Sequence, residues 1–95
     1  EVEFDINRVE YSAHFLADGT WRKTEHEIKK KAIPKNIKRI LKSEFSKYKI
    51  VEAEFVETPK GIFYEFGLKK GKIEIDVAID NTAKIIKKEI KENRD

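Results

Sequence analysis

The sequence predicts an α+β domain in which one amphipathic helix packs on one face of a mostly antiparallel sheet, in the order β-β-β-α-β-β-β-β. Two observations lead to this fold. Only residues 34–48 space their apolar side chains as a helix does, and the segments on both sides alternate apolar and polar residues with the period of a strand. The chain has 95 residues, which is enough for one modest core, so residues 1–95 are expected to form a single domain.

The expected helix has one apolar stripe and an otherwise charged surface. Its stripe consists of Ile37, Ile40, Leu41, Phe45 and Tyr48. Pro34 suits the first helical position, because its fixed φ is already helical and its missing N–H would have no partner there. Basic residues dominate residues 29–49, where Glu44 is the only acid. Because no arginine and aromatic platform accompanies them, a solvated helix face is favoured and nucleic acid is not expected as a partner.

The segments before the helix predict three strands. Residues 2–7 and 9–16 alternate, and Asp18-Gly19 is a strong hairpin signal. A turn centred on these two residues sets the pairing of the second and third strands. On one face it places Val9 opposite Ile28, Tyr11 opposite His26, Ala13 opposite Thr24 and Phe15 opposite Arg22; on the other it places Leu16 opposite Trp21, His14 opposite Lys23, Ser12 opposite Glu25 and Glu10 opposite Glu27. A slip of one residue would exchange the two faces.

Four more strands are expected after the helix, at residues 49–57, 62–68, 73–79 and 83–86. Turn signals at residues 59–61, 70–71 and 80–81 separate them. In the first of these strands, simple alternation places Val51, Ala53 and Phe55 on the side of the helix and Ile50 on the other side.

The two β-rich flanks resemble each other. Residues 9–23 match residues 73–87 without gaps, and residues 2–7 match YEFGLK after a shift of two residues. This pattern predicts a repeat of about 63 residues, with a partial first repeat at 1–28 and a complete second repeat at 34–90. Shared alternation between any two β-meanders is the alternative explanation.

Few residues are candidates for chemistry. The chain has no cysteine, which excludes disulfides and thiolate sites. His14 and His26 are expected on opposite faces and so cannot share a metal ion. No nucleophile elbow or glycine-rich loop accompanies Ser12 or Thr24, so no catalytic, metal-binding or cofactor-binding residue is assigned and no enzyme is expected. No apolar run reaches the length of a membrane helix, so membrane insertion is not expected either.

The order FLADGTW, KTE and IP ahead of a lysine-rich helix resembles the PepSY-like family of secreted or periplasmic bacterial domains, whose fold is related to that of the β-lactamase inhibitor protein (BLIP). The resemblance covers nearly the whole chain. It implies a helix on one face of an antiparallel sheet, a periplasmic or secreted location, and binding through the other sheet face. It carries no catalytic residue. The second hairpin departs from the pattern, because residues 80–83 lack the glycine that is common there.

The sheet face away from the helix is the candidate protein-binding surface, because exposed aromatic side chains among charges are typical of binding patches. Its proposed contact residues are Leu16, Trp21, Phe63, His14, Lys23, Glu25 and Glu65, accompanied by Ile50, Val56, Glu52 and Glu54. The predicted function is a non-catalytic exported module that binds a protein or peptide, with inhibition of an envelope or secreted enzyme as the expected mode. The alternatives are self-association into a homodimer through unpaired strand edges, and a purely structural Trp21 that packs on Leu16.

Overall fold

The computed structural model describes residues 1–92; the last three residues of the expected 1–95 domain lie outside the described residues. Seven strands form one antiparallel sheet in which every strand pairs with its neighbours in sequence. The strands are β1 (Val2–Ile6), β2 (Val9–Phe15), β3 (Trp21–Glu27), β4 (Lys49–Thr58), β5 (Gly61–Lys70), β6 (Ile73–Asp80) and β7 (Ile85–Glu92). The order of strands and helix agrees with the prediction, although β7 begins at Ile85 and not at the expected residue 83.

Helix α1 (Lys35–Glu44) lies between β3 and β4, preceded by a short 3₁₀ turn at Lys30–Ala32. Two details of the predicted helix are wrong. Pro34 is the N-cap with extended backbone, not the first helical residue, and the helix ends at Glu44, ahead of the expected Tyr48. The Phe45 N–H still bonds the Leu41 carbonyl at 3.0 Å, but Phe45 itself has left helical geometry. Its ring remains buried, so the apolar stripe continues into the loop.

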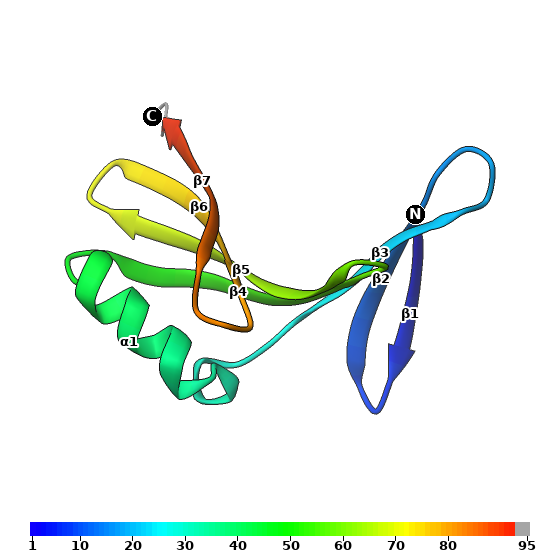
Figure 1. The fold of residues 1–95 in the computed structure, drawn as a ribbon, viewed down its shortest axis with the longest axis horizontal. Coiled ribbons are helices and arrows are strands. Elements are labelled where there is room, and N and C mark those ends of the chain that lie inside the picture. The colour runs from blue at the N-terminus through cyan, green and yellow to red at the C-terminus, as the bar shows by residue number, and fades with distance from the viewer. Residues whose placement is uncertain (93–95) are drawn as a thin grey trace.

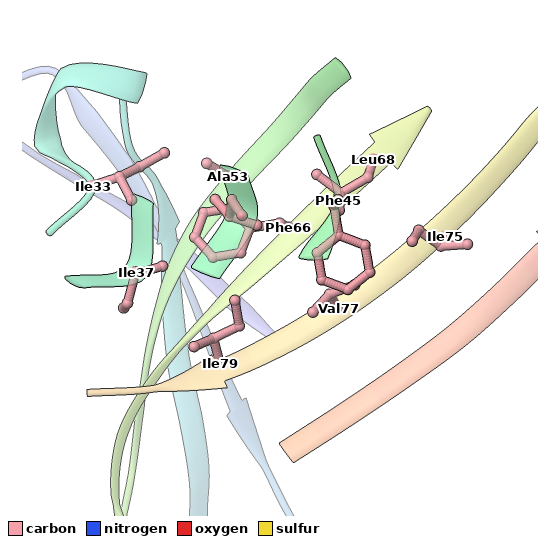
Figure 2. Packing of buried hydrophobic residues seen from close by; sticks show 10 residues of the cluster. Ile33, Ile37, Phe45, Ala53, Phe66, Leu68, Ile75, Val77 and Ile79 are labelled. Atoms are coloured by element: carbon pink, nitrogen blue, oxygen red, sulfur yellow. The ribbon is translucent and has the colours of Figure 1, made fainter. Parts of the chain in front are cut away.

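The core lies between α1 and strands β4 to β7 (Figure 2). Its buried members are Ile33, Ile37, Leu41, Phe45, Ala53, Phe66, Leu68, Ile75, Val77 and Ile79. We call the sheet face that contacts α1 the helix-side face and the opposite one the open face. Figure 1 shows that α1 lies beside β4 to β7 only, and that β1, β2 and the first part of β3 continue beyond it.

The first hairpin keeps the predicted register along most of its length. Tyr11 pairs with His26 and His14 with Lys23, as expected. A β-bulge after His14 then changes the register, so Phe15 lies opposite Trp21 rather than Arg22, and the expected Leu16–Trp21 pair does not form. Leu16 lies in the turn, where its N–H bonds the Thr20 carbonyl at 2.8 Å.

Gly19 closes this turn with a φ of +90°, in the left-handed region, and a Cβ at Gly19 would meet no atom within 4 Å. Gly19→Ala is therefore expected to lower the free energy of unfolding by about 0.5–1 kcal/mol, through backbone strain alone, partly offset by a stiffer unfolded chain. Urea unfolding would measure the loss. Ala17→Gly in the same turn is the matched control, and an unchanged midpoint for Gly19→Ala would contradict the assigned turn geometry.

A second bulge lies in β4 between Ile50 and Glu52. It reverses the predicted faces at the start of this strand: Ile50 pairs with Leu68 and packs against the core, whereas Val51 is 54% exposed. Gly67 lies opposite the bulge, and a Cβ there would approach the Glu52 Cβ to 3.2 Å. The close approach of the two backbones therefore favours glycine at this position.

Candidate functional site

The open face is built by the alternate residues of the middle strands that point away from α1. Two rows of paired residues cross it. One runs from Glu54 on β4 through Glu65 to Ala78 on β6, and the other joins Glu25 on β3, Val56 and Phe63. Acidic side chains therefore meet at the centre of the sheet, beside a small apolar area.

Three carboxylates gather where these rows meet. Oxygen atoms of Glu25, Glu54 and Glu65 all lie within 4.8 Å of one another, and each side chain is partly buried. We call these three residues the carboxylate cluster. His14 and Lys23 are its nearest basic neighbours: His14 Nε2 lies 3.2 Å from Glu25 Oε1, and Lys23 Nζ lies 3.5 Å from Glu25 Oε2. Both basic groups contact Glu25, and the ion pairs of the described residues include none for Glu54 or Glu65.

The environment of Glu54 favours the protonated acid. Burial raises the pKa of Glu54 to about 7 from an ordinary 4.5, and the negative charge of Glu25 adds to the effect. Burial also raises the pKa of Glu65, where the positive charge of Lys23 opposes the shift. The cluster therefore holds less than its full negative charge near neutral pH.

Two hollows flank the carboxylate cluster. The larger, with a volume of about 550 Å³, lies over β2 to β4, and its acidic lining comes from Glu10, Glu25, Glu27 and Glu54. The smaller, of about 220 Å³, lies over β4 to β7 and is lined by Glu52, Glu54, Glu65, Asp76 and Lys91 among others. The open face is thus acidic at its centre, although the chain as a whole has a net charge of +3.

The apolar part of the open face is smaller than predicted. Phe63 is half-buried there, but Val56 is 0% exposed and Ala78 is also buried. Val56 therefore supports the surface from beneath and has no side-chain area to offer a partner. Phe63 is the one predicted aromatic contact that the described structure places on this face.

Five of the seven predicted contact residues lie together on the open face: His14, Lys23, Glu25, Phe63 and Glu65. Leu16 is 50% exposed but belongs to the turn between β2 and β3. The predicted face of Trp21 is wrong, because the bulge places it opposite Phe15 on the helix-side face. There its Nε1–H donates to Thr24 Oγ1 at 2.8 Å. The predicted face of Ile50 is also wrong, because the bulge between Ile50 and Glu52 places Ile50 on the helix-side face.

The sequence interpretation did not assign a role to Asp76 or recognise how the acids converge. Asp76 lines the smaller hollow, and its Oδ2 lies 2.7 Å from Lys91 Nζ. A signal was present: Glu52 and Glu54 alternate on β4, and Glu65 occupies the matching face of β5. Finding the cluster also required the β3–β4 pairing, which no local turn specifies.

The chemical repertoire of the carboxylate cluster is limited. His14 and His26 point to opposite faces, as predicted, so they cannot act on one ion. Three carboxylates carry six oxygens, so Ca²⁺ would need both oxygens of each, or added water, to reach the roughly six to eight ligands that it takes. What the arrangement does offer is a concentrated set of acceptors for the cationic side chains of a partner.

None of the helices among residues 1–92 has both the length and the apolar character needed to cross a bilayer. A single antiparallel sheet with one covering helix and an uncovered second face makes this an α+β protein. Residues 1–87 match the model of the PepSY-like family, described as "Putative beta-lactamase-inhibitor-like, PepSY-like", and the chain belongs to this family.

Solved structures of Bacteroides proteins share the fold. A DUF2874 family protein from Bacteroides uniformis superimposes with a TM-score of 0.84 at 14% identity, covering 93% of this chain and 67% of that one. A BLIP-like protein from Bacteroides fragilis gives 0.81 at 16% identity, covering 96% and 67%. A structure from Bacteroides eggerthii described as "putative periplasmic proteins" gives 0.82 at 14%, covering 93% and 67%. The comparison with curated protein sequences found no match.

Proposed function

We propose that this chain is a non-catalytic exported module that binds a protein through its open face, with the carboxylate cluster receiving basic side chains of the partner. The family description is inhibitor-like rather than catalytic, and one structural neighbour is described as periplasmic. Both support an extracytoplasmic binding role. An enzyme of the envelope or a secreted enzyme is the target class that this description favours.

The observation that carries the proposal is the half-buried carboxylate cluster between two acid-lined hollows. Burying like charges together costs free energy, and among the described residues the ion pairs with His14 and Lys23 are made by Glu25 and not by Glu54 or Glu65. A lysine or arginine of a partner would supply the missing positive charge to Glu54 and Glu65. Hydrogen bonds between charged groups are stronger than neutral ones, so a bound basic side chain would be held firmly.

Phe63 gives the proposed site its apolar anchor. It lies on β5 one position from Tyr64 and two from Glu65, and it pairs with Val56 and Asp80 across the sheet. Aromatic anchors beside charged acceptors are the residues on which binding energy usually concentrates. The proposed contact area therefore joins Phe63 to the carboxylate cluster.

Capture from a bacterial envelope extract, with partners quantified by mass spectrometry, tests the proposal. Phe63→Ala and the pair Glu54→Gln with Glu65→Gln are each expected to reduce recovery of the specific partner at least about tenfold, as for the loss of a hot-spot contact. Lys42→Ala, on α1, is the matched control and should leave recovery unchanged. Equal recovery by the native chain and by all three variants would contradict binding through the open face.

Self-association is the second candidate function, favoured by the outer edge of β1. Among the strands that the structure describes, β1 pairs with β2 alone, and every residue of β1 is exposed. Unpaired strand edges can pair with a second copy. A sedimentation series that finds a dimer insensitive to Phe63→Ala would favour this function over the first.

A further inference from the structure

The helix-side face of β1 to β3 exposes large apolar side chains that no element among residues 1–92 covers. Val2 is 52% exposed, Phe4 38%, Phe15 46% and Trp21 37%. All four lie on the same face because Val2 pairs with Ala13, Phe4 with Tyr11, and Phe15 with Trp21. We call these four residues the uncovered patch. Contiguous exposed apolar side chains are typical of interaction surfaces.

The uncovered patch is continuous with the core under α1. A row of rings crosses the helix-side face from β1 to β5, with centroids 5.4 Å apart for Phe4 and Tyr11, 4.5 Å for Tyr11 and His26, 5.5 Å for His26 and Phe55, and 5.3 Å for Phe55 and Tyr64. The same apolar surface therefore begins beneath α1 and continues onto β1 and β2, the strands that Figure 1 shows beyond the helix.

Strands β1 to β3 reproduce the backbone geometry of β5 to β7 at one constant spacing along the chain. The bulge after His14 corresponds to the bulge after Ala78. Gly19, with φ +90°, corresponds to Ala83, with φ +68°. In the first turn the Leu16 N–H donates to the Thr20 carbonyl at 2.8 Å. In the second turn the Asp80 N–H donates to the Lys84 carbonyl at 2.9 Å, at the equivalent positions.

The same spacing applies to β1, without the two-residue shift used in the sequence alignment. Val2 pairs with Ala13 as Phe66 pairs with Val77, and Phe4 pairs with Tyr11 as Leu68 pairs with Ile75. Val2 thus occupies the position of Phe66, Phe4 that of Leu68, and Phe15 that of Ile79.

Equivalent positions differ sharply in burial. Phe66 and Leu68 are each 1% exposed and Ile79 is 0% exposed, because α1 lies over them and β4 pairs with β5. Their counterparts Val2, Phe4 and Phe15 are exposed, and among residues 1–92 no helix lies above them and no strand pairs with the outer side of β1. The two halves of the sheet present the same kind of apolar surface, and one half lacks its cover.

We propose that the uncovered patch binds a helix–strand segment with the chemistry of residues 33–58, its strand pairing with the outer edge of β1 and its amphipathic helix lying over Val2, Phe4, Phe15 and Trp21. The solved neighbours support an additional segment, because about a third of each lies outside the part matched by this chain. The site lies on the face opposite the carboxylate cluster, so the proposal is independent of binding through the open face, whereas it competes with self-association for the outer edge of β1.

A fused chain tests the proposal directly. Glu1 occupies the position of Glu65, so residues 33–64 placed immediately before Glu1 would supply the helix and strand in the correct register without a linker. Trp21 is the only tryptophan and reports on the patch. We expect its emission to shift to the blue and the Tm to rise by about 5 °C or more, relative to a fusion that carries the same residues in scrambled order.

Variants of the fused chain decide where the segment binds. Phe4→Glu should return the Trp21 emission and the Tm to the values of the scrambled fusion, whereas Val51→Glu, at another exposed apolar site, should change neither. Phe4 is on an edge strand, so circular dichroism of the unfused variant should show an intact sheet. Identical behaviour of the two fusions would overturn the proposal. So would an unfused dimer that Phe4→Glu dissociates, because a second copy would then be the occupant.

Discussion

Phe66→Ala is expected to lower the free energy of unfolding by about 3–5 kcal/mol, the usual loss when a buried aromatic ring is removed from a core. Phe66 is 1% exposed on β5, between Ala53 and Val77 of the neighbouring strands, and faces α1 (Figure 2). A cavity at this position would remove contacts to the helix and to both strands. For a domain of this size, the loss is a large part of the total stability.

Urea unfolding followed by circular dichroism would measure this loss. Phe15→Ala is the matched control, because it removes the same atoms from a ring that is 46% exposed, and we expect a loss below about 1 kcal/mol there. If Phe66→Ala does not fold, Phe66→Leu should give a smaller, measurable loss. Equal effects of the two alanine substitutions would contradict the core assignment.

Glu54→Gln is expected to stabilise the protein at pH 8 and to have little effect at pH 4. The pKa of Glu54 is about 7 in the folded chain and 4.5 ordinarily, so the folded state retains a proton that the unfolded state releases between these values. The stability linked to this proton is complete below pH 4.5 and is lost as pH rises through 7. Because water reaches the half-buried carboxyl, we expect a contribution on the order of 1–2 kcal/mol, less than the full shift implies.

Thermal unfolding of both proteins between pH 4 and pH 8 would measure the effect. The Tm of the native chain should fall relative to that of Glu54→Gln as pH increases. Glu57→Gln, at an exposed position of the same strand, is the control and should follow the native pH dependence. Parallel curves for the native chain and Glu54→Gln would show that the carboxylate cluster does not hold its proton in the folded state.

Alternation predicted the strands and most of the faces, but it could not predict the bulges. A bulge adds one residue to one strand, and its position depends on how two backbones fit rather than on side-chain polarity. The bulge after His14 moved Trp21 to the helix-side face, and the bulge after Ile50 moved Ile50 into the core. The predicted faces hold from Tyr11 to His14 in β2, before its bulge, and from Glu52 onward in β4, after its bulge.

The carboxylate cluster was predictable only in part. The sequence places Glu54 and Glu65 on one face of adjacent strands, because a short turn connects β4 with β5. Glu25 joins them only through the β3–β4 pairing, and these strands are separated by the helix and its flanking loops. A long connection does not fix a register, so the meeting of the three acids becomes visible only in three dimensions.

The strictly sequential order of the sheet also bears on how the molecule opens. Each strand pairs with its neighbours in sequence, and α1 packs only over the later strands. The β1–β2 hairpin can therefore separate from β3 without breaking any contact of α1 with the sheet. Such partial opening requires less free energy than global unfolding. Protection from hydrogen exchange should thus decrease along the sheet from β5 and β6 toward β1, with the N-terminal hairpin behaving as a separate cooperative unit.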